Sequence, residues 1–257
     1  METIKITSCQ NQLVKFSVNL QNPKFRKEQK LILVDGEKTI KGLIDDGIVF
    51  EYVFLKENCP YLKDFKAKQL ILTTDEVLKK ISTTKTPTEV VGIIKEKEVD
   101  KNIFKNFKHI ALIDGIKDAG NLGTIIRSAV AFSIDGIILF NDCVDLYNSK
   151  VIRSSAQNMF KIPILRTKDL DFIKELKKTH KLISTVVNTD NELFEQDFSG
   201  NFIIALGSEA NGLSKEIIDI SDTLATIKMD NNVESINLGV CASISFALIK
   251  SISRFRK

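Results

Sequence analysis

The stretch LIDGIKDAGNLGTIIRSAVAF (Leu112–Phe132) decides how the second half of this chain is interpreted. Apolar residues at Ile110–Ile113 predict a buried strand, and the pattern of Thr124–Phe132 predicts a helix. A glycine-containing loop joins the two, and α/β proteins bind nucleotides at loops of this kind. The glycines, however, are not spaced as GxGxxG, and no Gly-Lys-Ser/Thr follows them. The dinucleotide fingerprint and the P-loop are therefore both excluded, and with them a nicotinamide dehydrogenase.

One arginine, Arg127, interrupts the apolar pattern of this helix. Such a residue needs either an anionic partner or a route to solvent, and the residues alone leave both possibilities open. Asn121 is a candidate N-cap of the helix. Gly123 indicates a place where another group approaches the backbone closely.

A second loop, ALGSEANGLS (Ala205–Ser214), follows a strand predicted at Asn201–Leu206. Gly207 at its start would allow a ligand to come close to the backbone. Glu209 adds a carboxylate to the loop. A tight strand-to-helix turn without any ligand is the simpler alternative.

A third loop lies within IKMDNNVESINLGVCASISF (Ile227–Phe246), after a strand predicted at Thr223–Met229. Ser235 is a good N-cap, and Asn237 would then lie in the first turn of a helix predicted over Ser235–Ser253. This helix is apolar or small on most faces. It is therefore expected to be buried all round, in a core or in a subunit interface.

The chain divides into two α/β domains near residue 100. Residues 95–108 are highly charged and lack a sustained apolar period, and a strong apolar strand follows them. The first part predicts a small α/β sandwich. Its expected elements are strands at Leu31–Val34, Val49–Leu55, Gln69–Thr74 and Thr86–Lys95, with a helix near Gly36–Asp45. In the second part, strands alternate with helices, which predicts a mostly parallel sheet covered on both faces.

Composition excludes several classes of protein. The 257 residues are 43% hydrophobic and 27% charged, as in a globular chain with a sizeable core. No apolar run approaches the roughly 20 residues of a membrane span. The start METIKITSCQ lacks the plan of a signal peptide, so a cytoplasmic location is expected. The four scattered cysteines and two histidines argue against a zinc site, a disulfide framework and a Ser-His-Asp triad, and no metal is expected.

The charge of the chain permits a nucleic-acid partner without requiring one. The net charge is +4 and the pI about 8.7. Residues 1–30 hold six Lys or Arg against two acidic residues. From the residues alone, this segment is either a solvated face or a surface for RNA.

Taken together, the three loops resemble a known family. NLGTIIR, GSEANGLS and SINLGVCASI are similar, in order and spacing, to the three signature motifs of the SpoU/TrmH family of RNA ribose methyltransferases, within the SPOUT superfamily. Upstream, LVDGEKTIKGLIDDGI and TKTPTEVVGII resemble the ribosomal-protein-L30-like RNA-binding domain that many members carry. The resemblance implies an L30-like domain at residues 1–98 and a SPOUT methyltransferase domain at residues 105–257.

The resemblance implies a SPOUT domain with a deep trefoil knot, which periodicity could not predict. It also implies S-adenosylmethionine as the methyl donor and a homodimer whose active site lies at the subunit junction. Matching the motifs places cofactor contacts at Gly207, Ile227, Ile236 and Leu238.

The same matching places catalytic residues at Asn121, Arg127, Glu209, Ser235 and Asn237. The family's arginine is often described as a general base. A protonated guanidinium, however, suits gripping a phosphate and stabilising the developing alkoxide of a ribose 2′-hydroxyl. The third motif departs from the usual Ser-Leu-Asn-Val-Ser, because Gly239 replaces a small hydroxyl residue. This replacement lowers helix propensity and can alter a polar contact, but it does not imply an inactive enzyme.

The expected function is therefore 2′-O-methylation of RNA, with 23S rRNA as the first choice of substrate because members with the L30-like domain mostly act on rRNA. The same chemistry on tRNA, and a non-catalytic RNA-binding or assembly factor, are the alternatives. The basic residues Lys24, Arg26 and Lys27 are the expected contacts to the RNA backbone, together with Arg127. A looped or single-stranded target is favoured, because a 2′-hydroxyl must be splayed into the pocket.

Overall fold

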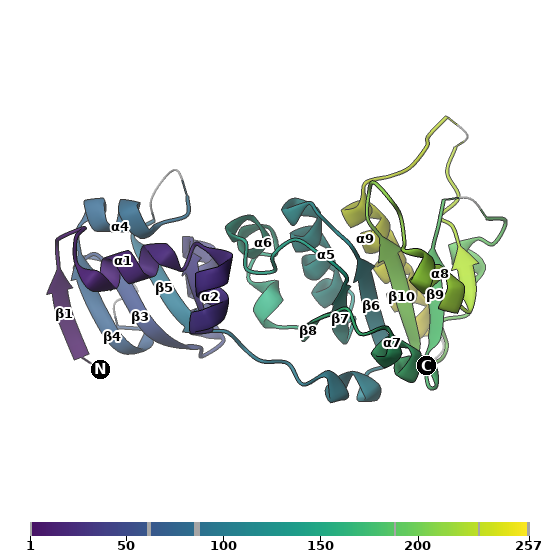
Figure 1. The fold of residues 1–257 in the computed structure, drawn as a ribbon, viewed down its shortest axis with the longest axis horizontal. Helices are drawn as coiled ribbons and strands as arrows, with labels where there is room; N and C mark the ends of the chain where they lie inside the picture. The colour runs from purple at the N-terminus through teal and green to yellow at the C-terminus, as the bar shows by residue number, and fades with distance from the viewer. Residues whose placement is uncertain (1, 61–62, 85–87, 188, 231, 256–257) are drawn as a thin grey trace. The chain divides into compact units, whose positions relative to one another are not determined.

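The computed structural model describes residues 2–60, 63–84, 88–187, 189–230 and 232–255. The chain forms two compact units, Met1–Glu98 and Val99–Lys257, each with its own sheet (Figure 1).

The first unit is built on a mixed sheet whose strand order is β1-β4-β3-β5-β2. β5 pairs antiparallel with both β3 and β2, whereas β1, β4 and β3 pair in parallel. The expected strand Val49–Leu55 is found with the same bounds, and the short N-terminal strand was not expected. The strands are β1 (Glu2–Ile6), β2 (Leu31–Asp35), β3 (Val49–Leu55), β4 (Lys66–Thr73) and β5 (Val90–Lys95).

Helices cover both faces of this sheet. Val91 and Ile93 of β5 pack in one apolar cluster with residues of α1 and α4. Gly92, which lies between them, faces the ring of Phe50 and Ile40 of α3 on the opposite side. The helices are α1 (Gln12–Asn19), α2 (Pro23–Gln29), α3 (Glu37–Asp45) and α4 (Asp75–Ile81). Residues 23–30, expected only to be basic, thus contain a helix, which Asn22 caps by accepting from Lys24 N at 2.9 Å.

The second unit is built on a six-stranded sheet of order β11-β9-β10-β6-β7-β8, in which every described pair of strands is parallel. This agrees with the expectation of a mostly parallel sheet. The strands are β6 (His109–Asp114), β7 (Gly136–Phe140), β8 (Ile164–Thr167), β9 (Lys181–Thr185), β10 (Phe202–Gly207) and β11 (Thr223–Ala225).

Both faces of this second sheet are buried. Ile110 and Leu112 of β6 join a cluster with α7, α8 and η1, and the intervening Ala111 and Ile113 are equally buried on the other face, toward α5 and α9. The helices are α5 (Ala119–Ala131), α6 (Ser149–Ser154), α7 (Leu170–Lys177), α8 (Lys215–Ile220) and α9 (Leu238–Phe255). Three short 3₁₀ segments complete the unit: η1 (Lys101–Asn106), η2 (Asn158–Phe160) and η3 (Leu193–Glu195).

Helix α5 begins five residues earlier than the sequence pattern predicts, at Ala119 rather than Thr124. The predicted N-cap, Asn121, is wrong: Asp118 caps the helix by accepting from Asn121 N at 2.8 Å. Gly123 is therefore helical. A Cβ on it would lie 1.8 Å from Ser154 Oγ, so the expected close approach is made by α6 and not by a ligand.

Candidate active site

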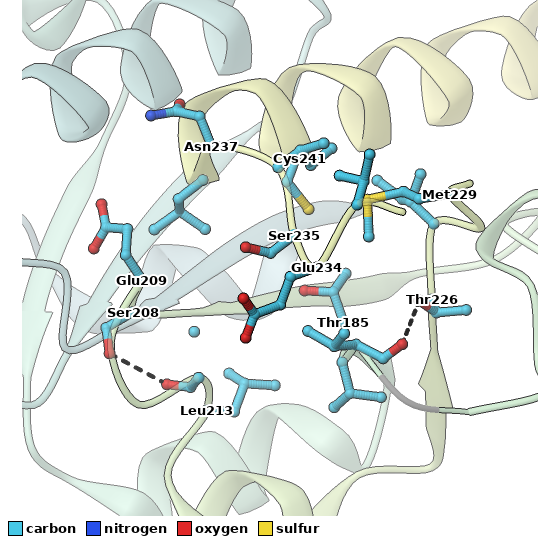
Figure 2. Close-up of a pocket in the computed structure, with 18 of the residues that line it drawn as sticks. Thr185, Ser208, Glu209, Leu213, Thr226, Met229, Glu234, Ser235, Asn237 and Cys241 are labelled. Atoms are coloured by element: carbon cyan, nitrogen blue, oxygen red, sulfur yellow. Dashed lines mark hydrogen bonds between the residues drawn. The ribbon is translucent and has the colours of Figure 1, made fainter. Parts of the chain in front are cut away.

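Loops that follow β9, β10 and β11 surround a cavity of about 990 Å³ at the carboxyl ends of the strands (Figure 2). One wall is the segment Gly207–Leu213, between β10 and α8. The opposite wall comes from the segment between β11 and α9, and Thr185 at the end of β9 lies between the two walls. Parallel α/β sheets bind their ligands at this edge.

A chain of side-chain hydrogen bonds joins three distant segments beside this cavity. Asn121 Nδ2 donates to Glu209 Oε1 at 2.5 Å, and Asn237 Nδ2 donates to Asn121 Oδ1 at 2.9 Å. The start of α5, the loop after β10 and the start of α9 are thereby fixed to one another. All three residues come from the motifs that the sequence singled out.

Asn237, and not Ser235, caps α9. Asn237 Oδ1 accepts from Gly239 N at 2.9 Å and from Val240 N at 3.3 Å, and the helix begins at Leu238. The prediction of Ser235 as the N-cap and first residue of the helix is therefore wrong. Ser235 is exposed on the cavity wall, and within the described chain its hydroxyl forms no hydrogen bond.

Gly207 is required by the fold of the loop that follows it. A Cβ at this position would lie 2.0 Å from the backbone carbon of Gly212 and 2.1 Å from the nitrogen of Leu213. The loop doubles back on itself, with Ser208 and Gly212 exchanging backbone hydrogen bonds of 3.0 and 2.9 Å. Any side chain at residue 207 would push this wall of the cavity apart.

A buried carboxylate, Asp114, holds the far end of the same loop. Asp114 Oδ2 accepts from Ser214 N at 2.7 Å, and Oδ1 accepts from Asn141 Nδ2 at 2.9 Å. Asp114 also pairs with Gly207 in the register of β6 and β10. One residue, only 3% exposed, therefore holds both ends of the loop. Its position at the last residue of a buried strand was a signal available in the sequence.

The residues expected to contact a cofactor, namely Gly207, Ile227, Ile236 and Leu238, all line the cavity. So do Glu209, Ser235 and Asn237 among the expected catalytic residues. Asn121 is bonded to two of these residues. Sequence reasoning missed Glu234 and Cys241, which line the same cavity; Glu234 could have been found as the acidic neighbour of Ser235.

Arg127 lies apart from this group. It is exposed on α5, in a stripe with Thr124 and Ala131, and it does not line the cavity of its own chain. Among the residues that the structure describes, Arg127 forms no hydrogen bond or ion pair. Exposure to solvent is thus what accommodates this arginine in an otherwise apolar helix.

Two titratable groups near the cavity are shifted by their surroundings. The backbone N–H of Asn121, followed by the ammonium of Lys150, lowers the pKa of Asp118 and keeps this cap ionised. Burial raises the pKa of the Cys241 thiol to about 11. In the described ranges, no group of three or more His, Cys, Asp and Glu side chains is arranged to hold a metal ion.

The basic residues expected to meet RNA differ in their surroundings. Lys24 and Lys27 are exposed on α2. Arg26 is only 6% exposed, and its guanidinium donates to Leu20 O at 2.9 Å. The expectation of Arg26 as an RNA contact is therefore wrong, because its side chain is used inside the first unit.

No helix in the described ranges is long and apolar enough to cross a membrane.

Comparison with known proteins matches both units. The model of the family described as "SpoU rRNA Methylase family" matches residues 108–247. A second model, "MRM3-like substrate binding domain", matches residues 11–92.

Similar proteins extend over nearly the whole chain. An uncharacterized tRNA/rRNA methyltransferase of Synechocystis sp. is 32% identical over 248 residues, covering 93% of this chain and 90% of that protein. The 23S rRNA (guanosine(2553)-2′-O)-methyltransferase RlmP of Bacillus subtilis is 25% identical, covering 93% and 96%. The crystal structure of an AdoMet-bound rRNA methyltransferase from Sinorhizobium meliloti has the same fold, with a TM-score of 0.88 at 24% identity over 97% of this chain and 98% of that chain.

Proposed function

This chain belongs to the SpoU rRNA methylase family, and from that premise we propose that it transfers a methyl group from S-adenosylmethionine to a ribose 2′-hydroxyl of 23S rRNA. The observation that carries the proposal is the junction beside the cavity, where Glu209, Asn121 and Asn237 are joined by hydrogen bonds. The similarity to the 23S rRNA 2′-O-methyltransferase of Bacillus subtilis supports the choice of substrate.

The cavity suits this cofactor in size and chemistry. A volume of about 990 Å³ is at the upper end of small-molecule sites. The backbone of residues 207–213 offers polar groups at close approach, while Ile227, Ile236 and Leu238 offer apolar contacts. When bound, S-adenosylmethionine supplies an electrophilic methyl group on a sulfonium centre.

Within this site, we assign a bracing role to three of the expected catalytic residues. The side-chain amides of Asn121 and Asn237 and the carboxylate of Glu209 are engaged with one another and with the start of α9. These hydrogen bonds fix the start of α5, the loop after β10 and the start of α9 relative to one another. Ser235, whose hydroxyl has no such partner, is then the residue placed to orient the ribose hydroxyl, a poor nucleophile near neutral pH.

Arg127 would bind the phosphate next to the target ribose and stabilise the developing alkoxide. A guanidinium stays protonated at neutral pH, so this electrostatic role is favoured over that of a base. Because Arg127 does not line the cavity of its own chain, it would act from the second subunit of a homodimer.

A deep trefoil knot in the second unit is part of the same proposal. Helix α9 comes directly after β11, which lies at the edge of the sheet. It nevertheless contacts β10 and α5 at the middle of the unit, so the chain returns from the edge to the centre, and this path supports the knot. The match of residues 11–92 to a substrate-binding domain supports an RNA-binding role for the first unit. Lys24 and Lys27 are its proposed contacts to the RNA backbone, and the proposed location is the cytoplasm.

The experiment that tests this function is a map of ribose methylation in rRNA and tRNA from cells with and without the gene. Loss of one 2′-O-methyl group in 23S rRNA is the expected result. Loss in a tRNA would assign the same chemistry to the alternative substrate. Unchanged methylation of both would leave the non-catalytic RNA-binding factor.

A further inference from the structure

Glu234 is the acidic residue of the cavity wall whose role neither the loops' architecture nor the bracing network explains. It precedes Ser235 in the segment between β11 and α9, is exposed, and lines the cavity. Figure 2 shows its carboxylate pointing into the cavity, between Ser235 and Thr185 and toward the wall that contains Leu213.

The other charged side chains of the described cavity lining are engaged elsewhere. Glu209 accepts from Asn121 at 2.5 Å, and Lys228 donates to Glu192 at 2.8 Å. Asp230 accepts from the backbone N–H of Asn232 at 3.1 Å. Within the described ranges, Glu234 has neither a hydrogen bond nor an ion pair. Of the three carboxylates on this wall, Glu234 is thus the one that accepts no hydrogen bond within the described ranges, while the ammonium of Lys228 is paired with Glu192.

We propose that Glu234 is the anionic partner of a cationic group of the bound cofactor; this inference rests on the proposed function. S-adenosylmethionine has two such groups, the sulfonium and the α-ammonium. A carboxylate in a partly enclosed cavity attracts either of them more strongly than it would in open water. Glu234 thus contributes to cofactor affinity, while the backbone and apolar groups of the walls contribute to the shape of the site.

A carboxylate beside the cofactor stabilises the ground state at least as much as the transition state. If it faces the sulfonium, it favours S-adenosylmethionine over the product S-adenosylhomocysteine, which lacks that charge but keeps the α-ammonium. Removing the charge should therefore raise the KM for the cofactor more than it lowers kcat.

The test is calorimetric titration of the wild-type protein, Glu234→Gln and Asp219→Asn with the two nucleosides S-adenosylmethionine and S-adenosylhomocysteine, each in turn. Glu234→Gln keeps the shape of the side chain and removes its charge. Asp219→Asn is the matched control, because Asp219 is an exposed carboxylate on α8 outside the cavity. Thermal unfolding of each variant verifies that it is folded.

We expect Glu234→Gln to bind S-adenosylmethionine about tenfold or more weakly, with Asp219→Asn within about twofold of wild type. An equal loss for both nucleosides would assign Glu234 to the α-ammonium, and a loss confined to S-adenosylmethionine would assign it to the sulfonium. Unchanged affinity in Glu234→Gln, or the same loss in Asp219→Asn, would overturn the inference. If the wild-type protein bound neither nucleoside, the proposed function itself would fail.

Discussion

Asn237 donates a hydrogen bond of 2.9 Å to Asn121, and the two residues are 116 positions apart in the sequence. Asn121 in turn donates a hydrogen bond to Glu209, so both the oxygen and the nitrogen of its side-chain amide form hydrogen bonds. An amide carries its acceptor and its donors on separate atoms, so Asn121 can accept from Asn237 and donate to Glu209 at the same time. We therefore expect the geometry of the proposed active site to depend on this side chain.

Replacing that amide with a carboxylate is expected to be worse than removing it. Asn121→Asp would set two carboxylates side by side, whereas Asn121→Ala only deletes two hydrogen bonds on a partly exposed site, at about 1 kcal/mol each. Steady-state kinetics should show lower kcat/KM for both variants. The Asp variant should be the poorer at pH 8 and recover as the pH falls, since one carboxyl then protonates. Wild-type turnover in Asn121→Asp would contradict this account.

Asp114 is expected to affect cofactor affinity because it anchors the loop Gly207–Leu213 that forms one wall of the cavity. Asparagine at this position can accept from Ser214 N or from the Asn141 amide, but its own NH₂ group would face the other donor. Asp114→Asn should lose about 1–3 kcal/mol of unfolding free energy and bind S-adenosylmethionine more weakly. Urea unfolding and calorimetry measure the two effects.

A compensating variant separates a hydrogen-bond defect from general damage. In Asp114→Asn combined with Asn141→Asp and Glu216→Gln, residue 141 becomes the acceptor for both of its neighbours. Glu216 is changed because its carboxylate accepts from Asn141 at 3.1 Å and would repel an aspartate there. The triple variant should recover much of the lost affinity. Affinity as low as in the single variant would rule out the anchoring role of Asp114.

We expect a side chain at residue 239 to be disfavoured, because Thr124 of α5 leaves little space beside Gly239. A Cβ at residue 239 would lie 3.1 Å from both Cβ and Cγ2 of Thr124, closer than ordinary packing allows. Gly239→Ser should therefore destabilise the protein by about 1 kcal/mol despite its better helix propensity. In a Thr124→Ala background, which removes Cγ2, the penalty should be smaller. Equal shifts in thermal unfolding temperature in both backgrounds would show that Thr124 is not the cause.

Cys241 is expected to react slowly although it lines the cavity. Its pKa of about 11 lies above that of an ordinary thiol, so the thiolate is a minor species at pH 8. Alkylation by iodoacetamide should be roughly two orders of magnitude slower than for free cysteine, and should accelerate as the pH rises toward 11. Mass spectrometry of the modified peptides measures the rate at this residue. Modification at the rate of an exposed thiol would contradict this effect of burial on the thiol.

The alternation of apolar strands and helices was enough to predict the parallel sheet of the second unit, because strands such as Gly136–Phe140 are buried on both faces and read as continuous apolar runs. Helix ends were less predictable. Ser235 and Asn237 both suit an N-cap, and the bond to Asn121, which comes from far away in the sequence, favours Asn237.

The exposure of the two helical arginines was also not predictable from local sequence. Arg26 lies in a basic segment and Arg127 in an apolar one, yet Arg26 is buried with its guanidinium bonded to Leu20 O, and Arg127 is exposed on α5. Neither outcome follows from local periodicity, because the packing partners are set by the fold of the whole unit.

The most direct measurement of the central claim uses the purified protein, methyl-labelled S-adenosylmethionine and 23S rRNA. Digestion of the RNA to nucleosides followed by mass spectrometry locates the label. We predict label on a ribose 2′-oxygen, with transfer abolished in Arg127→Ala while the variant keeps its fold. Label on a base, no transfer by the wild-type protein, or wild-type transfer by Arg127→Ala would contradict it.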